Sequence, residues 1–495
     1  MVEKVFVPDS IRQSMRMTIS KRGAGLLVVW LLWLGYLALT DTGAFWISLV
    51  FVPVFGVITW SAIRSRNIVL QAFAVFMFIA QAIGAPFLWL SRSNYGGPGF
   101  GSVGSFQFDL GEFFLIYVWV AALYGALVWS TRKWDTCIWP RRGAVSRFLQ
   151  QIQSTAPART SRRTVRVFDA LLVAFIVLFM VPLNVYMSTN NIGTLGLLND
   201  PLPYRLTGIM YYTRLYFGPL LILVLFAKSS RSWMLVSVIL GYAVFAGLSS
   251  ASRTVLLVSM FPAGYFAILG RQKARLAIVS VVGVLGFLLT SGSRDYTYGG
   301  TAFALGDAFE VALSFLLSGQ ISIFDTIGGI ANRFYGAQDM ILAYQFVRED
   351  TWLAMVNYFM SGGRADAIVP DLGRDFYDMN LEGTGFGVGI GTMAYMLILS
   401  HSNILVMPFA VMALGFLISA GNQVLNYALA KAVAAKLVSH SVASGPLRIM
   451  FGGFMGFSLY SSSINYYYLL VQILVFLVII LSLRRAFIKQ NPTHH

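Results

Sequence analysis

The sequence predicts an all-α polytopic membrane protein, and three observations support that fold class. Of the 495 residues, 57% are hydrophobic and only 11% are charged, whereas about a quarter of the residues of an average soluble protein are charged. The mean hydropathy is +0.71. Apolar runs also recur along the chain at lengths close to the roughly 20 residues that a membrane-spanning helix needs.

About 12 such runs are present, counted against that length requirement. Their number and hydropathy exclude a soluble enzyme, a transcription factor and a secreted mini-domain. The predicted spans are 24–40, 44–62, 68–90, 111–130, 167–188, 207–227, 233–249, 254–270, 276–291, 404–424, 446–462 and 466–483.

The distribution of basic residues predicts the orientation of these spans. The net charge is +16, and the basic residues concentrate in alternate loops, which the positive-inside rule assigns to the cytoplasm. We therefore expect both termini to be cytoplasmic. No dense basic stripe with interleaved aromatic residues is present, so nucleic acid is not an expected partner. Every lysine falls on the predicted cytoplasmic side: Lys4, Lys21, Lys133, Lys228, Lys273, Lys431, Lys436 and Lys489.

The chain divides into three regions. Residues 1–291 hold nine predicted helices and a basic cytoplasmic loop at 131–166, and residues 403–495 hold three more helices and a cytoplasmic tail. Between them, the outer loop 292–402 contains 12 of the 20 acidic residues, five arginines and no lysine. We expect this large loop to be helical in part. Its stretch 385–400 is apolar but rich in glycine, which favours a re-entrant segment over a span.

Metal or disulfide chemistry is not expected. Cys137 is the single cysteine, which excludes a disulfide scaffold and a cysteine-based metal site. Four histidines, two of them at the C-terminus, leave little for a histidine-rich metal centre. We therefore expect neither a metal nor another cofactor.

Three arginines at a common depth are the main candidates for a binding site. Arg214 follows Tyr211 within the sixth predicted span, Arg253 lies in the outer turn before the eighth, and Arg294 lies where the ninth span emerges. A charge inside a span is costly and indicates function. Guanidinium groups bind phosphate oxygens in a bidentate manner and stay charged. These arginines and Tyr211 are therefore candidates to hold a diphosphate, although each arginine can instead snorkel to the interface or pair with a carboxylate.

The outer loop supplies further candidates. Any of its arginines can contact a substrate, but salt bridges within the acidic loop are the simpler interpretation. A proton acceptor can come from Asp295, from Glu382 beside flexible glycines, or from His401 at the outer end of the tenth predicted span, and each of these can also be a solvated or paired residue. The loop arginines with this possible role are Arg333, Arg364 and Arg374.

At this point the sequence resembles the Wzy-type polymerases of O-antigen and other oligosaccharide repeat units, which are bacterial inner-membrane proteins. The matching features are Ser249–Thr254 at the start of a span, the long loop after the ninth span, and Gly383–Leu399 leading into Asn403–Gly415. The resemblance covers roughly residues 160–480 and rests on topology more than on invariant motifs.

The resemblance implies a GT-C-like fold and a metal-independent glycosyltransferase. It implies transfer of a growing glycan from one undecaprenyl diphosphate to the end of another lipid-linked repeat at the periplasmic face. Arginines would stabilise the charge that develops on the leaving diphosphate, and a carboxylate or histidine would accept the hydroxyl proton. The implied partners are the undecaprenyl-diphosphate-linked glycan, membrane lipids and a polysaccharide chain-length regulator.

Two other functions compete with this hypothesis. An O-antigen ligase uses the same donor, but related ligases depend on a histidine in the periplasmic loop, and no histidine occurs between residues 292 and 400. A flippase for lipid-linked glycans would need access from both faces, whereas the polar residues of this chain gather on the outer one. Polyprenyl-phosphate glycosyltransferases with acidic motifs in a large first outer loop are disfavoured, because that loop is very short here.

Overall fold

The computed structural model shows helices as the regular structure of every range that it describes. Those ranges cover most of the predicted spans but little of the large outer loop. They are residues 27–91, 109–137, 162–190, 206–298, 391–434 and 447–461, with 192, 310, 313–314, 340, 344 and 445 as isolated positions.

Seven helices in the described part are long and apolar enough to cross a membrane. The structure therefore confirms an all-α polytopic membrane protein, while the total of about 12 spans and the GT-C-like fold stay predictions. The seven are Thr42–Ile63, Ile68–Pro86, Leu110–Cys137, Val165–Thr189, Ile209–Lys228, Lys273–Thr290 and Met407–Val433.

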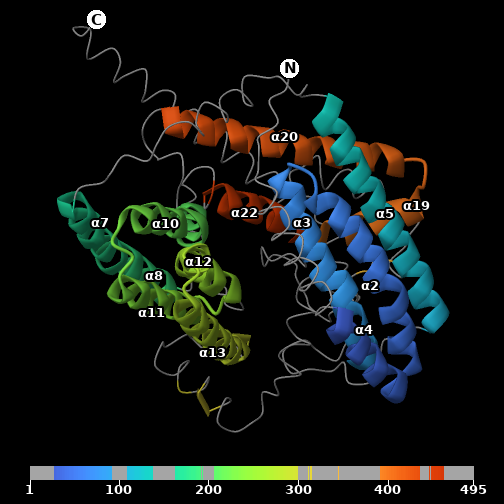
Figure 1. Cartoon of the computed structure of the whole chain (residues 1–495), viewed down its shortest axis with the longest axis horizontal. Coiled ribbons are helices and arrows are strands. Elements are labelled where there is room, and N and C mark those ends of the chain that lie inside the picture. The colour runs from blue at the N-terminus through green and yellow to red at the C-terminus, as the bar shows by residue number, and fades with distance from the viewer. Residues whose placement is uncertain are drawn as a thin grey trace, which may run out of the picture.

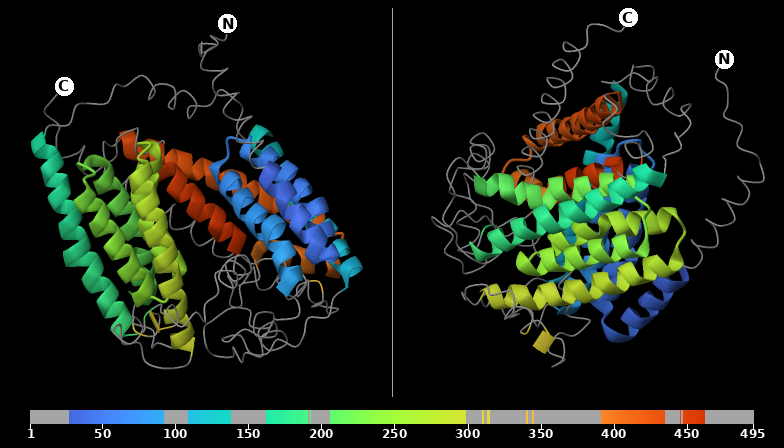
Figure 2. Two further views of the ribbon diagram at one scale, coloured as in Figure 1. Left: turned by 60° about the horizontal axis from the view of Figure 1, so that its bottom comes forward. Right: turned by 90° about the vertical axis from the view of Figure 1, so that its left-hand side faces the viewer.

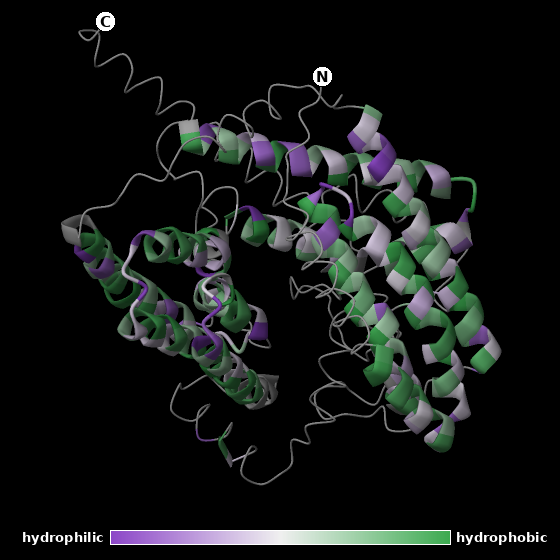
Figure 3. Ribbon diagram, viewed as in Figure 1, coloured by the Kyte–Doolittle hydropathy of each residue, from purple (hydrophilic) through white to green (hydrophobic). Residues whose placement is uncertain are grey.

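Most of the described helices form two groups (Figure 1, Figure 2). The first group consists of α2 (Thr42–Ile63), α3 (Ile68–Met77), η1 (Phe78–Ile83), α4 (Gly84–Ser91) and α5 (Leu110–Cys137). The second group consists of α7 (Arg162–Ala174), η2 (Phe175–Met180), α8 (Val181–Thr189), α9 (Leu206–Tyr212), η4 (Thr213–Phe217), α10 (Gly218–Lys228), α11 (Trp233–Ser249), α12 (Arg253–Leu269) and α13 (Lys273–Tyr298). Apolar residues dominate the helices of both groups (Figure 3).

Three of the described elements are π-helices, and a proline follows each one within three residues. Pro86 follows η1, Pro182 follows η2 and Pro219 follows η4. Proline lacks a backbone N–H and clashes with the carbonyl four residues earlier, and the turn before each of these three prolines has the wider π geometry. The helices α2 and α12 stay α-helical around Pro53 and Pro262. The predicted spans 68–90, 167–188 and 207–227 each contain one of these π-helices.

The helix α22 (Arg448–Ser461) packs closely on α3 of the first group. A Cβ atom added at Gly456 would lie 2.5 Å from the Cβ atom of Ala72, and one added at Gly452 would lie 2.6 Å from the side chain of Ile68. Small residues four apart allow the backbones of two membrane helices to approach in this way. The spacing of these two glycines thus fixes α22 against α3.

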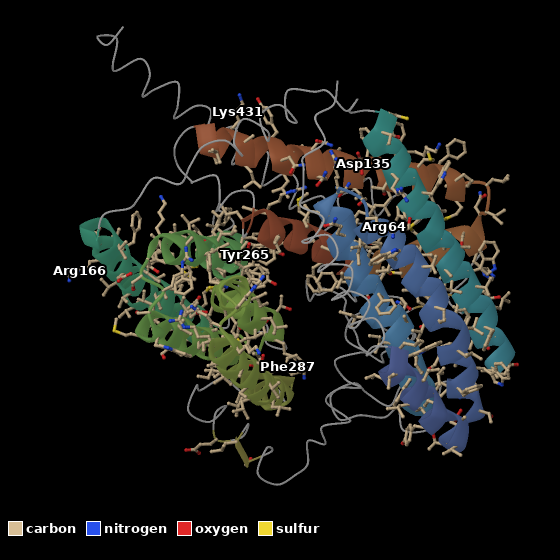
Figure 4. All side chains as sticks on the ribbon, in the orientation of Figure 1. Arg64, Asp135, Arg166, Tyr265, Phe287 and Lys431 are labelled. Carbon is tan, nitrogen blue, oxygen red and sulfur yellow. The ribbon has the colours of Figure 1, made fainter. Side chains whose placement is uncertain are left out.

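A polar clamp joins α20 (Met407–Ala434) to the first group. The carboxylate of Asp135 on α5 accepts hydrogen bonds from the Asn67 side chain at 3.3 Å and from the Ser419 hydroxyl at 2.6 Å. The Asn422 side chain accepts the backbone N–H of Ile68 at 3.2 Å. Because these partners lie at the predicted cytoplasmic ends of α3 and α5, α20 crosses that end of the group obliquely (Figure 1, Figure 4).

The short helix α19 (Gly391–Ser402) lies within the protein. Its 12 residues give a length of about 18 Å, well short of the ~30 Å hydrocarbon core. Residues 392–400 are all buried, and the Thr392 hydroxyl donates to the carbonyl of Leu459 on α22. Arg448 begins α22 at its predicted cytoplasmic end, and Leu459 lies roughly 17 Å further along this helix at 1.5 Å per residue. The start of α19 therefore lies at that depth from the predicted cytoplasmic end of α22. The length and depth of α19 favour a re-entrant helix.

Candidate functional site

Arg214 is buried in the middle of a predicted span. It is the second residue of η4, its exposed fraction is 0%, and it is among the largest fully buried side chains of the described chain. Pro219 follows this π-helix, as described above. A guanidinium group inside a membrane bundle is costly and needs specific partners. Its position therefore marks the centre of the candidate site.

Two tyrosines lie near this guanidinium group, and one of them connects it to polar side chains on two further helices. Its carbon lies 5.9 Å from the centre of the Tyr211 ring, and it interacts electrostatically with Tyr242 on α11. The hydroxyl of Tyr242 accepts a hydrogen bond from Asn184 on α8 at 3.4 Å and lies near Ser259 on α12. We call these five residues the Arg214 cluster.

The Arg214 cluster holds a polar atom that the protein itself does not satisfy. The Asn184 side chain is 0% exposed and its amide nitrogen donates to the carbonyl of Met180 at 2.8 Å. Its amide oxygen has no hydrogen-bond partner among the described residues. A buried polar atom without a partner costs about 1–3 kcal/mol and often marks a functional position.

Arg253 lies in the same helix group but nearer the predicted outer end. It is the first residue of α12, and its guanidinium carbon lies 4.5 Å from the centre of the Phe287 ring on α13 (Figure 4). It is partly exposed, unlike Arg214. Ser259 of the Arg214 cluster is six residues further along α12, which is about 9 Å along the axis. The start of α12 adds the partial positive charge of a helix N-terminus.

Arg294 and Asp295 lie on α13, which continues to Tyr298. The sequence predicted that this span ends at residue 291, because the apolar run ends there. Loss of hydropathy marks where a helix leaves the hydrocarbon and does not stop the backbone ladder. Both residues are therefore helical, and Arg294 is seven residues beyond Phe287 on the same helix.

His401 is not beside the arginines. It is exposed in the last turn of α19, and its ring meets the ring of Tyr344 edge-on with 4.6 Å between the centres. The helix α19 lies beside α5, apart from the second helix group that holds η4 (Figure 1). The structure therefore does not bring His401 together with Arg214.

The remaining sequence candidates lie outside the described residues, and their proximity to Arg214 stays a prediction. Among the described residues, no group of three or more His, Cys, Asp or Glu side chains gathers that would suit a metal ion. The candidates outside the described residues are Glu382, Arg333, Arg364 and Arg374.

The sequence interpretation missed three members of the Arg214 cluster. Asn184 interrupts the apolar run 167–188 and could have been found as a polar residue within a span. Tyr242 and Ser259 are unremarkable in sequence, because tyrosine and serine are common in membrane helices. Only the folded structure places Tyr242 near Arg214 and Ser259 near Tyr242.

The fold and the site together define a class of protein. The chain is an α-helical polytopic membrane protein with a buried arginine in a π-helix and a second arginine at the end of a neighbouring helix. Comparison with protein-family models, with curated proteins and with solved structures gave no match.

Proposed function

We propose that this protein polymerises oligosaccharide repeat units carried on undecaprenyl diphosphate, at the periplasmic face of a bacterial inner membrane. The single observation that carries the proposal is the burial of Arg214. A permanently charged group is retained at 0% exposure in the second helix group, where an apolar residue would cost nothing. An anionic lipid-linked substrate gives this charge a role.

The three arginines act on the diphosphate in different ways because they lie at different depths. Arg253, which is partly exposed, and Arg294 bind the diphosphate oxygens near the outer ends of α12 and α13. Arg214 is buried and acts through its electric field. The Coulomb energy between its charge and one negative charge is about 1.7 kcal/mol at 10 Å for an effective dielectric constant of 20. Such fixed charges stabilise the negative charge that develops on the leaving group.

The reaction is a displacement at the anomeric carbon. A hydroxyl of the acceptor sugar attacks, the bond from the anomeric carbon to the diphosphate oxygen breaks, and the lipid diphosphate leaves with the electron pair. The hydroxyl proton passes to a carboxylate acting as general base. Asp295 is our first candidate because α13 carries it next to Arg294, and Glu382 is the second.

The decisive experiment supplies purified protein in lipid nanodiscs with synthetic undecaprenyl-diphosphate repeat units. We expect a ladder of polymers in the presence of EDTA, and strong loss of the ladder in Arg214→Gln and Arg253→Gln. The matched control is Arg166→Gln, an exposed arginine at the predicted cytoplasmic end of α7 (Figure 4).

Three results would contradict the proposal. A full ladder in both arginine variants would remove the role of the two guanidinium groups. An absolute need for divalent metal would exclude the metal-independent mechanism. Translocation of the lipid across vesicles without bond formation would instead show a transporter, and transfer only to a lipid A core acceptor would show a ligase.

A further inference from the structure

Tyr216 connects the π-helix that carries Arg214 to α22. Its ring meets the ring of Phe454 edge-on, with 4.9 Å between the centres. Its hydroxyl forms a hydrogen bond with Ser458, whose side chain is 2% exposed. The five residues of η4 thus direct Arg214 into the second helix group and Tyr216 towards α22.

The same α22 is attached to the first helix group. Phe457 meets the ring of Phe76 on α3 edge-on, with 5.2 Å between ring centres, and Gly452 and Gly456 fit closely against α3. The contact of Tyr216 with α22 therefore joins the two helix groups. Figure 2 shows α22 between them.

We propose that Tyr216 is a positioning residue, which holds η4 on α22 and thereby sets the orientation in which Arg214 faces the lipid diphosphate. This inference rests on the proposed function. Its physical basis is that a π-helix is a rare and locally weak element, so a fixed contact two residues away controls the direction of the arginine side chain. A small misplacement of a stabilising charge lowers the rate of the chemical step more than it weakens substrate binding.

The first test measures kcat and KM for the synthetic lipid-diphosphate repeat unit. Tyr216→Phe and Ser458→Ala each remove the same hydrogen bond and keep the Phe454 ring contact. We expect each to lower kcat about fivefold to tenfold, in line with one lost hydrogen bond, with KM changed less than about twofold. The double variant should be no worse than either single one, and Ser458→Thr, which keeps a hydroxyl, should restore kcat.

The matched control is Tyr186→Phe, an exposed tyrosine on α8 of the same helix group. It should leave kcat and KM unchanged. Thermal unfolding of every variant is measured beside the kinetics. A fall in kcat that follows only a loss of folded protein, or that Ser458→Thr does not repair, would overturn the positioning role.

The second test does not depend on activity. Cys137, the exposed single cysteine at the end of α5, and a cysteine introduced by Lys273→Cys at the exposed start of α13 carry spin labels on the two helix groups. We expect Tyr216→Phe and Ser458→Ala to broaden the distance distribution between the labels, and Tyr186→Phe to leave it unchanged.

The two tests separate the possible failures. An unchanged distance distribution in both hydrogen-bond variants would show that the contact does not hold the groups together. A broadened distance distribution with normal kcat would show that the contact joins the two helix groups but does not set the orientation of Arg214. Absence of any transfer by the unaltered protein would contradict the proposed function, while the distance measurement would still decide whether the contact joins the groups.

Discussion

The guanidinium group of Arg253 lies over the ring of Phe287, with 4.5 Å between the guanidinium carbon and the ring centre. This contact joins the start of α12 to the outer half of α13. A cation–π contact is worth about 0.5–2 kcal/mol, and it restricts a side chain that is otherwise long and mobile. The ring therefore orients the Arg253 side chain near the predicted outer surface.

Replacement of this ring should impair the proposed polymerisation without removing the charge. Phe287→Leu loses roughly 1 kcal/mol of cation–π attraction, so we expect about a fivefold lower kcat/KM for the proposed lipid-diphosphate substrate. The measurement is the initial rate of polymer formation. Phe409→Leu, at an exposed position of α20, serves as the control, and equal rates for the two variants would remove the role of the ring.

Close packing of α22 on α3 should tolerate no added methyl group at Gly456. A Cβ atom there would meet Ala72 at 2.5 Å and the backbone nitrogen of Phe73 at 2.7 Å. We expect Gly456→Ala to lower the apparent melting temperature of the purified protein by several degrees, as overpacking costs about 1–3 kcal/mol. The neighbouring Gly453 has open space around it, so Gly453→Ala should melt like the unaltered protein. Equal melting of the two variants would be evidence against the packing.

The polar clamp at Asp135 should stabilise the position of α20. Asp135→Ala removes the acceptor for Asn67 and Ser419 and leaves their buried polar groups unsatisfied, at about 1–3 kcal/mol. We expect a lower melting temperature and faster proteolysis near residue 434. Thr136→Ala, at an exposed residue whose hydroxyl bonds only within its own turn, should change neither. Normal protease resistance of Asp135→Ala would show that α20 is held by other contacts.

The single cysteine offers a direct test of orientation. Cys137 is exposed at the end of α5, on the side that the basic loops assign to the cytoplasm. A membrane-impermeant maleimide should label it in inverted inner-membrane vesicles and not in intact spheroplasts. Thr40→Cys in a Cys137→Ser background is exposed at the opposite end of the group and should show the reverse. Labelling of Cys137 in spheroplasts would overturn the predicted orientation.

Hydropathy predicted the helical membrane class and the positions of the seven candidate spans in the described part of the chain, because burial in hydrocarbon depends on the composition of about 20 consecutive residues. It did not predict the π-helices before Pro86, Pro182 and Pro219, since the surrounding residues stay apolar. It placed the end of the ninth span at residue 291, although α13 continues to Tyr298.

The candidate site was predictable only where a charge stands in an apolar run. Arg214 was found in this way. Tyr242 and Ser458 were not, because each acts through a partner far away in the sequence. Pairwise contacts between helices depend on rotation and crossing of the helices, which a single sequence does not specify.

The π-helix at η4 has a consequence for insertions and deletions. A π-turn contains one residue more than the α-turn that it replaces, and one residue corresponds to about 100° of rotation in an α-helix. Deleting a single residue between Thr213 and Phe217 would let the backbone close into a regular α-helix. The half of the span before it would then rotate by that angle relative to α10, and the aromatic ring of Tyr211 would point to a different neighbour.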